Sequence, residues 1–304
     1  MKDFWKNINI AIIGGDRREV DLYFYLKTLG AGAYIYGFDY SDLLSDSEKI
    51  KTEELPEIVS FSDVIITPLS GIDASGEIYA PYAAEKILLS HIPVLSSIRP
   101  KTLLLAGHVH SYWRNILFRK GVIFYETSYV DEISIYGAIP TAEGALQYAM
   151  MNTDITIHNS NSFVLGFGRC GKIIAETLRA LGADVTVVVR QKEGVTAWIE
   201  AFKMNPLLLS DLPKEISKAD IVFNTIPAVV LDETALKNMK GSSLIIDIAS
   251  YPGGVAMASA QRMGIRTMNL PGLPGKVAPK TAGKILCRVY PSLIYSILKG
   301  GKHL

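Results

Sequence analysis

The sequence predicts an α/β protein built from two Rossmann-like domains, each with a doubly wound parallel sheet, and an interdomain cleft. Two observations lead to this prediction. Short runs rich in Val, Ile and Leu alternate with longer amphipathic stretches, as in parallel sheets covered by helices on both faces. The alternation occurs twice along 304 residues, 49% of which are apolar, and this length is enough for two cores of ordinary domain size.

The first half of the chain begins with a buried strand and a helix. The strand is "NIAIIGG", and apolar residues then recur at helical spacing until Gly30 and Gly32 end the helix. Further strands are expected at "AYIYGFD", "SDVIITPLSG", "IPVLSSI" and "GVIFYET". The first turn, "GGDRR", lacks a third glycine and carries charges, so it does not satisfy the dinucleotide fingerprint.

A helix over residues 140–151, starting with Pro140 in its first turn, is predicted to lead into the second half. The second half is expected to have strands at "NSFVLGFG", "ADVTVVVR", "ADIVFNTIP", "SSLIIDIAS" and "IRTMNLPG". Residues 270–284 are rich in Pro and Gly and predict a rigid loop. A final helix, interrupted at Pro291, should return to the first half. The predicted domains are therefore residues 1–138 plus 283–304, flavodoxin-like and discontinuous, and residues 139–282.

Composition excludes several classes of partner. The 31 basic and 30 acidic side chains form no long run of one sign, so neither nucleic acid nor an anionic membrane is an expected partner. No apolar run approaches the roughly 20 residues of a membrane span, and the N-terminus does not resemble a signal peptide, so a cytoplasmic protein is expected. Two cysteines without neighbouring ligands predict neither a disulfide nor a metal site.

The stretch "GFGRCG" is the strongest candidate for cofactor binding. It directly follows an apolar strand and precedes a helix, where glycines allow a tight turn, a close approach of the pyrophosphate and close helix packing. The amides at the helix start would hold phosphate. The predicted contacts are Gly166, Phe167, Gly168, Arg169, Cys170 and Gly171. The alternative is a purely structural turn. The helix N-terminus could lower the pKa of Cys170, but we interpret this residue as a small one beneath the phosphates, not a nucleophile.

The end of the next strand favours NADP over NAD. An acidic residue there would bind the ribose hydroxyls of NAD, whereas this chain has Arg190, Gln191 and Lys192, which suit a 2′-phosphate unless they form only a solvated basic loop. Small residues at two later strand ends leave room for the nicotinamide. These are Thr225, Ile226, Pro227, Ala249 and Ser250, while Asp247 either contributes or only braces the sheet.

Cations near strand ends and loops are candidates for binding a carboxylate. Lys276 and Lys280 lie in the Pro/Gly-rich segment, which is otherwise an ordinary interdomain crossing, and Arg17 and Arg18 follow the first strand. Each of these side chains could simply be solvated. His108, His110 and His158 are possible general bases, although most histidines are surface or core residues without such a role.

The chain resembles the family of dipicolinate synthase A subunits of endospore-forming bacteria over essentially its whole length. The resemblance rests on "GGDRR", "GFD", "IPTAEG", "DITIH", "GFGRCG", "NTIP", "DIASYPGG" and, most specifically, "PGLPGKVAPKTAG". It implies oxidation of dihydrodipicolinate to pyridine-2,6-dicarboxylate, with NADP as hydride acceptor, in the mother cell during sporulation. Arg18 and Lys280 match the family pattern and would hold the two carboxylates from opposite walls. Glu19 stands where Gln is expected, and Cys170 where Thr is commoner.

The resemblance also implies a partner, the flavoprotein-like B subunit of the synthase, and we expect a homo-oligomer such as a dimer. Because aromatisation favours the oxidation, the protein mainly has to orient the reactants and exclude water. If the substrate carries a 4-hydroxyl group, Ser70, Glu143 or His158 could assist the loss of water. The alternatives are a 2-hydroxyacid or alanine-type dehydrogenase, whose domain order the chain shares, or a non-catalytic NADP-binding regulatory subunit.

Overall fold

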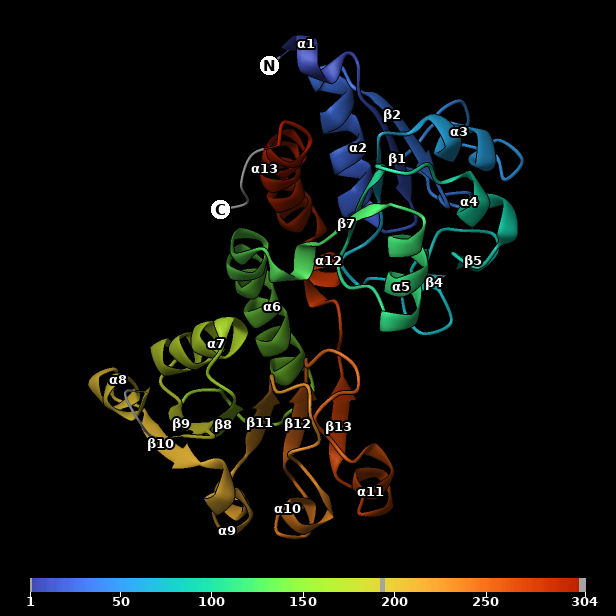
Figure 1. The fold of residues 1–304 in the computed structure, drawn as a ribbon. Coiled ribbons are helices and arrows are strands. Elements are labelled where there is room, and N and C mark those ends of the chain that lie inside the picture. Colours follow the sequence, from blue (N-terminus) through green and yellow to red (C-terminus); the bar gives the residue numbers. More distant parts are fainter. Residues whose placement is uncertain (1, 192–194, 301–304) are drawn as a thin grey trace. The chain divides into compact units, whose positions relative to one another are not determined.

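The computed structural model describes residues 2–191 and 195–300, and the chain divides into two compact units (Figure 1). Unit 1 comprises Met1–Tyr136 and Pro279–Leu304, and unit 2 comprises Gly137–Ala278. Each unit is built on a parallel sheet flanked by helices. The predicted fold class, two Rossmann-like α/β domains, is confirmed.

Unit 1 has a five-stranded sheet in the order β2-β1-β3-β6-β7. Its strands are β1 (Asn9–Ile13), β2 (Gly32–Tyr36), β3 (Val64–Ile66), β6 (Leu103–Ala106) and β7 (Ile123–Glu126), with a small hairpin of β4 (Glu77–Ile78) and β5 (Ile87–Leu88) beside it. Its helices are α1 (Lys2–Trp5), α2 (Arg17–Leu29), α3 (Leu55–Phe61), α4 (Ile92–Ser97), α5 (Ser111–Arg119) and α13 (Pro279–Leu298). Another helix, α6 (Asp131–Met151), begins in this unit and continues into unit 2.

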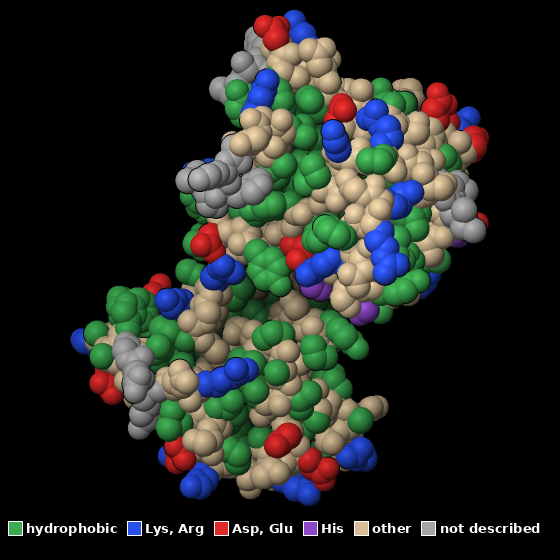
Figure 2. Space-filling view, in the orientation of Figure 1, with side chains coloured by type: hydrophobic (Ala, Val, Ile, Leu, Met, Phe, Trp, Pro, Cys, Tyr) green, Lys and Arg blue, Asp and Glu red, His purple; other side chains and the backbone are tan. Residues whose placement is uncertain are grey.

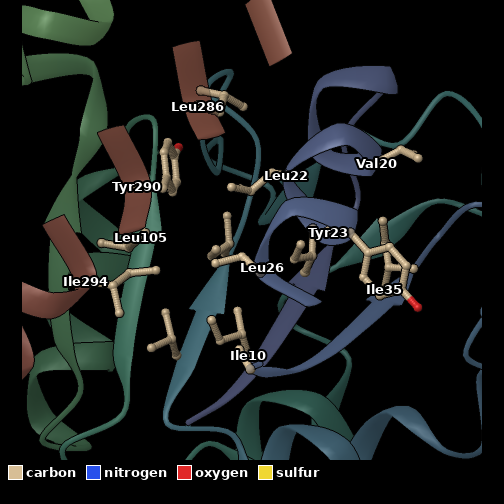
Figure 3. Close-up of a cluster of buried hydrophobic side chains, with 14 of the residues drawn as sticks. Ile10, Val20, Leu22, Tyr23, Leu26, Ile35, Leu105, Leu286, Tyr290 and Ile294 are labelled. Atoms are coloured by element: carbon tan, nitrogen blue, oxygen red, sulfur yellow. The ribbon is translucent and has the colours of Figure 1, made fainter. Parts of the chain in front are cut away.

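Alternation along the strands of unit 1 produces two cores, one on each face of the sheet. Ile10 and Ile12 pack with α2 and α13, whereas Ala11 and Ile13 pack with residues of α3 and α5. Figure 3 shows the first core, in which side chains of α13 such as Leu286 meet those of α2 and the strands. The end of the chain therefore completes a core that the first 136 residues begin.

Helix α2 has defined signals at both ends. Asp16 and Glu19 form a reciprocal capping box at the start of the helix. The Asp16 side chain accepts from the backbone N–H of Arg18 at 3.0 Å, and the Glu19 side chain accepts from that of Asp16 at 2.8 Å. Gly30 ends the helix in the left-handed conformation, with φ of 96°. Where α13 passes α2, a Cβ on Gly283 would lie 2.4 Å from a carboxylate oxygen of Asp21, so this crossing requires a glycine.

Unit 2 has a six-stranded parallel sheet in the order β10-β9-β8-β11-β12-β13. Its strands are β8 (Asn161–Leu165), β9 (Asp184–Val189), β10 (Asn205–Leu208), β11 (Ile221–Asn224), β12 (Leu244–Asp247) and β13 (Arg266–Asn269). Its helices are α7 (Arg169–Ala180), α8 (Val195–Ala201), α9 (Leu212–Glu215), α10 (Glu233–Lys237), α11 (Met257–Arg262) and α12 (Leu273–Val277). Residues of α6 and α7 share one core with the sheet, and residues of α9, α10 and α11 share the other.

Several predicted elements were wrong. The strand expected over residues 92–98 is helix α4 (Ile92–Ser97), and strands β6 and β10 were missed. Helix α6 begins at Asp131 and passes through Pro140, and the Thr141 hydroxyl donates to the carbonyl of Gly137 at 2.7 Å there. Residues 270–284 are not a loop: they contain α12 and the start of α13, with prolines in the first turns, where their missing N–H costs nothing.

Among the described residues, no helix is long and apolar enough to span a membrane, and no three His, Cys, Asp or Glu side chains form a group suited to a metal ion. Both cysteines are free thiols. On the face shown in Figure 2, lysine and arginine side chains are separated by apolar and other residues and form no continuous basic surface.

Candidate functional site

The glycine turn between β8 and α7 has the geometry that the sequence predicts for a dinucleotide site. Gly166 has φ of 95°, and a Cβ there would lie 2.5 Å from Oγ1 of Thr225. A Cβ on Gly171 would lie 2.2 Å from the carbonyl oxygen of Gly166, so the helix packs directly on the turn. At Gly168, the N-cap of α7, an added Cβ would meet nothing within 4 Å. The turn is therefore tight underneath and open above, as a bound pyrophosphate requires.

Cys170 supports the turn from below. Its thiol is hydrogen-bonded to the side chain of Thr141 on α6, and burial raises its pKa above the ordinary value. From the sequence, the helix N-terminus could lower this pKa, but the shift is upward. A thiol with a raised pKa is a poor nucleophile at neutral pH.

A hydrogen-bond network holds the ends of β11 and β12 together beside the turn. Asn224 and Asp247 are direct partners in the β11–β12 register, and Nδ2 of Asn224 donates to Oδ1 of Asp247 at 2.8 Å. The same carboxylate accepts from the N–H groups of Ala249 at 3.1 Å and Gly254 at 2.9 Å. Asp247 is 1% exposed, so it braces the two segments that carry the predicted nicotinamide contacts and does not face a ligand.

The predicted nicotinamide contacts follow directly after these two strands. The Thr225 hydroxyl donates to the carbonyl of Leu165 at 2.9 Å and so joins β11 to the glycine turn. Ile226 is half-buried and Pro227 is exposed, while Ala249 is buried and Ser250 is exposed. These residues lie at the carboxyl ends of β11 and β12, on the same edge of the sheet as the glycine turn at the end of β8.

The side chains at the end of β9 are exposed next to that turn. Arg190 and Gln191 follow β9, which pairs with β8, and both are exposed. Lys192, the third residue predicted here, lies outside the described residues. Arg169, in the first turn of α7, is also exposed. A cation that follows β9 is where a 2′-phosphate would be expected.

Sequence reasoning missed an aromatic cluster beside the turn. The ring of Phe167 meets that of Trp198 on α8 edge to face, with centroids 5.3 Å apart, and Trp198 stacks on Phe202 at 4.0 Å. Nζ of Lys172 lies 5.5 Å from the Phe167 ring centroid and 5.6 Å from that of Trp198. No spacing in the sequence indicates this cluster, because Phe167 and Trp198 are far apart in the sequence and come into contact only in the folded domain.

In unit 1, Arg18 is held by Asp16. Its Nε and Nη2 atoms lie 2.8 Å and 2.9 Å from the two carboxylate oxygens of Asp16, and the arginine is 6% exposed. Burial alone would lower the pKa of Arg18, but Glu19, when it is ionised, and the hydrogen-bonded carboxylate of Asp16 raise it overall, so the guanidinium stays charged. Two donors of Arg18 are therefore committed to Asp16.

Arg17, Asp21 and Lys280 form a second group of charges in unit 1. Burial raises the pKa of Asp21, and the charges of Arg17 and Lys280 act against that rise. Lys280 is exposed on the first turn of α13. Arg18 and Lys280 both belong to unit 1, whereas the predicted boundaries put Lys280 in the cofactor domain, on the wall opposite Arg18. The cause is that α13 starts at Pro279, before the boundary expected at 283.

The three residues proposed to assist loss of water are divided between the two units. Ser70 is exposed in the turn after β3 in unit 1, and Glu143 is exposed on α6 in unit 2. His158 precedes β8, and its Nδ1 lies 3.3 Å from the carbonyl oxygen of Leu181, at the amino edge of the unit 2 sheet. This edge is opposite the glycine turn, so we leave His158 out of the candidate site.

Two other histidines lie near the carboxyl edge of the unit 1 sheet. Nδ1 of His108 is 2.8 Å from Oε1 of Glu126, whereas His110 caps α5 by accepting from the N–H of Tyr112 at 3.4 Å. The pairing of His108 with Glu126 was not predicted.

Comparison with known proteins agrees with this architecture. The family model for the N-terminal domain of the dipicolinate synthase A subunit matches residues 9–128, and "Shikimate / quinate 5-dehydrogenase" matches residues 147–274. The A subunit of dipicolinate synthase from Bacillus subtilis is 37% identical over 294 residues, which is 95% of this chain and 97% of that protein. The chain belongs to the family of dipicolinate synthase A subunits.

Solved structures of this family have the same fold. The A subunit of dipicolinate synthase from Bacillus halodurans matches with a TM-score of 0.85 and 34% identity, covering 95% of this chain and 98% of that one. The Bacillus subtilis structure matches with a TM-score of 0.82 and 35% identity, covering 97% of this chain and 98% of that one. A transhydrogenase from Sinorhizobium meliloti shares the fold alone. It matches with a TM-score of 0.65 and 15% identity, covering 95% of this chain and 94% of that one. The family-model match over residues 147–274 indicates that unit 2 is a Rossmann domain of the dehydrogenase type.

Proposed function

We propose that this protein is an oxidoreductase that converts dihydrodipicolinate to dipicolinate, with NADP as hydride acceptor, in the mother cell during sporulation. The observation that carries the proposal is the similarity to the A subunit of dipicolinate synthase over 97% of that protein's length. The proposed reaction removes one hydride and one proton from the dihydropyridine ring and leaves an aromatic dicarboxylate.

The cofactor part of the proposal is supported by unit 2. The open space above Gly168 and the N–H groups that begin α7 suit a pyrophosphate, and the exposed Arg190 after β9 suits a 2′-phosphate. When bound, NADP would supply the hydride acceptor. Thr225 and Ala249, fixed by the strand-end network, would form the wall against the nicotinamide.

The substrate part assigns the carboxylates to cations of unit 1. Arg18 would bind one carboxylate through the nitrogen that Asp16 leaves unused, and the exposed amine of Lys280 would bind the other. Because Asp16 fixes the guanidinium, Arg18 would offer a preorganised donor and lose little side-chain entropy on binding. Ser70, on a neighbouring strand end, is the remaining predicted group of this unit.

We further propose that the protein acts as a homo-oligomer together with a flavoprotein-like B subunit of the synthase. The direct test mixes the purified chain, with and without that partner, with NADP and freshly prepared dihydrodipicolinate. The expected result is the ultraviolet spectrum of dipicolinate together with NADPH absorbance. NADPH binding without product under either condition would contradict the proposal and favour a non-catalytic regulatory role.

A further inference from the structure

An exposed histidine and a largely buried glutamate are paired at the carboxyl edge of the unit 1 sheet. Nδ1 of His108 lies 2.8 Å from Oε1 of Glu126, and the side chains are 55% and 11% exposed, respectively. The pair results from the topology, because β6 and β7 are parallel neighbours in which Ala106 is the partner of Glu126. The imidazole therefore reaches solvent, while the carboxylate behind it is enclosed.

Two donors besides His108 hold the Glu126 carboxylate. It accepts from the N–H of Val109 at 2.9 Å, and Nη2 of Arg114 lies 2.8 Å and 2.7 Å from its two oxygens. A carboxylate held by these donors accepts, and does not donate, toward His108. The hydrogen of a neutral His108 ring thus belongs on Nδ1, which leaves the lone pair of Nε2 available for a proton.

The position of His108 suits a ligand anchored at Arg18. In the strand order, β6 is two strands from β1, so the ends of these strands are separated by about 10 Å. The backbone of His108 is tightly held, since its carbonyl accepts from the N–H of Ile72 at 2.7 Å and a Cβ on Gly71 would lie 2.2 Å from that oxygen. The turn that carries Ser70 thereby packs directly on His108.

We propose that His108 is the base that accepts the ring proton, with Glu126 as its positioning residue; this assignment rests on the proposed function. When bound, NADP would supply the acceptor for one hydrogen of the dihydropyridine ring, which leaves as hydride. Nε2 of His108 takes a proton from the neighbouring carbon, and the electrons of that C–H bond form the last double bond of the aromatic ring. The imidazolium that results is stabilised by the Glu126 carboxylate, and the proton then passes to water.

The competing interpretation is structural: Glu126 would tie β7 to the segment after β6, and His108 would only cover it. Kinetics separate the two. Replacing His108→Ala should lower kcat by about 10²–10⁴-fold while leaving KM and NADPH binding near their wild-type values. Added imidazole should restore part of kcat, because the ring it replaces is half exposed. Glu126→Gln should lower kcat by a smaller factor and should not respond to imidazole.

His110→Asn is the matched control. It changes a histidine two positions away whose side chain has one described bond, the one that caps α5, and asparagine is itself a good N-cap, so kcat should be unchanged. If the wild-type chain produces dipicolinate and His108→Ala keeps kcat within twofold, the base assignment is overturned and the proposed function stands. The assignment is also overturned if the loss is confined to KM or is not rescued by imidazole. If the wild-type chain makes no dipicolinate with or without its partner, the proposed function is wrong, and the base assignment that rests on it is wrong as well.

Discussion

Glu19 gives unit 1 a specific dependence of stability on pH. The side chain is 1% exposed, and its carboxylate accepts from the N–H of Asp16 at 2.8 Å and packs where Gly15 has no Cβ. Burial raises its pKa from 4.5 to about 7, more than the nearby Arg18 charge lowers it. The folded protein therefore favours the protonated carboxyl.

The sign of the effect follows from proton binding. Between the unfolded pKa of 4.5 and the folded pKa of about 7, the folded state holds more protons than the unfolded state. Stability contributed by the neutral carboxyl is fully present below pH 4.5 and is lost as pH rises through 7. At 1.36 kcal/mol for each pKa unit, the loss amounts to about 3 kcal/mol.

Glu19→Gln should remove this dependence, because glutamine is neutral at all pH values and can also complete a capping box. The variant should match the wild type near pH 5 and exceed it near pH 8, by roughly 6–12 °C in melting temperature for a unit of this size. Melting followed by tryptophan fluorescence in a Trp198→Phe background reports unit 1, since Trp5 and Trp113 both lie there.

The control for this experiment is Glu57→Gln, which neutralises an exposed carboxylate on α3 of the same unit. Its melting temperature should run parallel to that of the wild type across the range. Curves for wild type and Glu19→Gln that stay parallel between pH 5 and 8 would refute the reasoning, because they would mean that Glu19 has the same pKa in the folded and unfolded chains.

Three predictions concern unit 2. Gly168→Ala should leave the melting temperature unchanged but weaken NADPH binding tenfold or more, and equal binding by this variant and the wild type would contradict a phosphate site in the open space above Gly168. Gly171→Ala, whose Cβ would lie 2.2 Å from a backbone oxygen, should instead destabilise the unit by about 1–3 kcal/mol. Arg190→Asp should reduce affinity for NADP relative to NAD by roughly 10–100-fold in fluorescence titrations, and an unchanged preference would refute its assignment to the 2′-phosphate. NADPH binding should quench Trp198, which lies beside the turn, so a Trp198→Phe variant should lose most of the quenching while still binding.

Local sequence signals predicted the glycine turn because its requirements are local. The spacing of Gly166, Gly168 and Gly171 already specifies a left-handed residue, an open N-cap and a close helix contact. The C-cap at Gly30 was predictable for the same reason. Residues 92–98 were mistaken for a strand because a short apolar run does not distinguish strand from helix.

Features that depend on strand order could not be predicted. His108 and Glu126 meet only because β6 and β7 are neighbours in register, and β6 itself was missed. The pairing of Asn224 with Asp247 likewise requires the β11–β12 register. The Asp16–Arg18 pair is the exception, since the two residues are close together in the sequence. The "GDRRE" stretch contained the signal, but its arginines were interpreted as carboxylate anchors and the pair with Asp16 was not predicted.

The assignment of Lys280 to unit 1 changes what the two proposed carboxylate anchors imply. With Arg18 and Lys280 on opposite domains, a dicarboxylate would have to bridge them, and its affinity would depend on domain closure. With both on unit 1, where Asp21 feels the charge of Lys280 and Asp16 fixes Arg18, the anchors belong to one folded body. Dicarboxylate binding would then be a property of unit 1, and cofactor binding a property of unit 2. A dicarboxylate that binds with the same affinity in the presence and absence of NADP is the behaviour expected from this division, because neither ligand needs the other to complete its own set of donors.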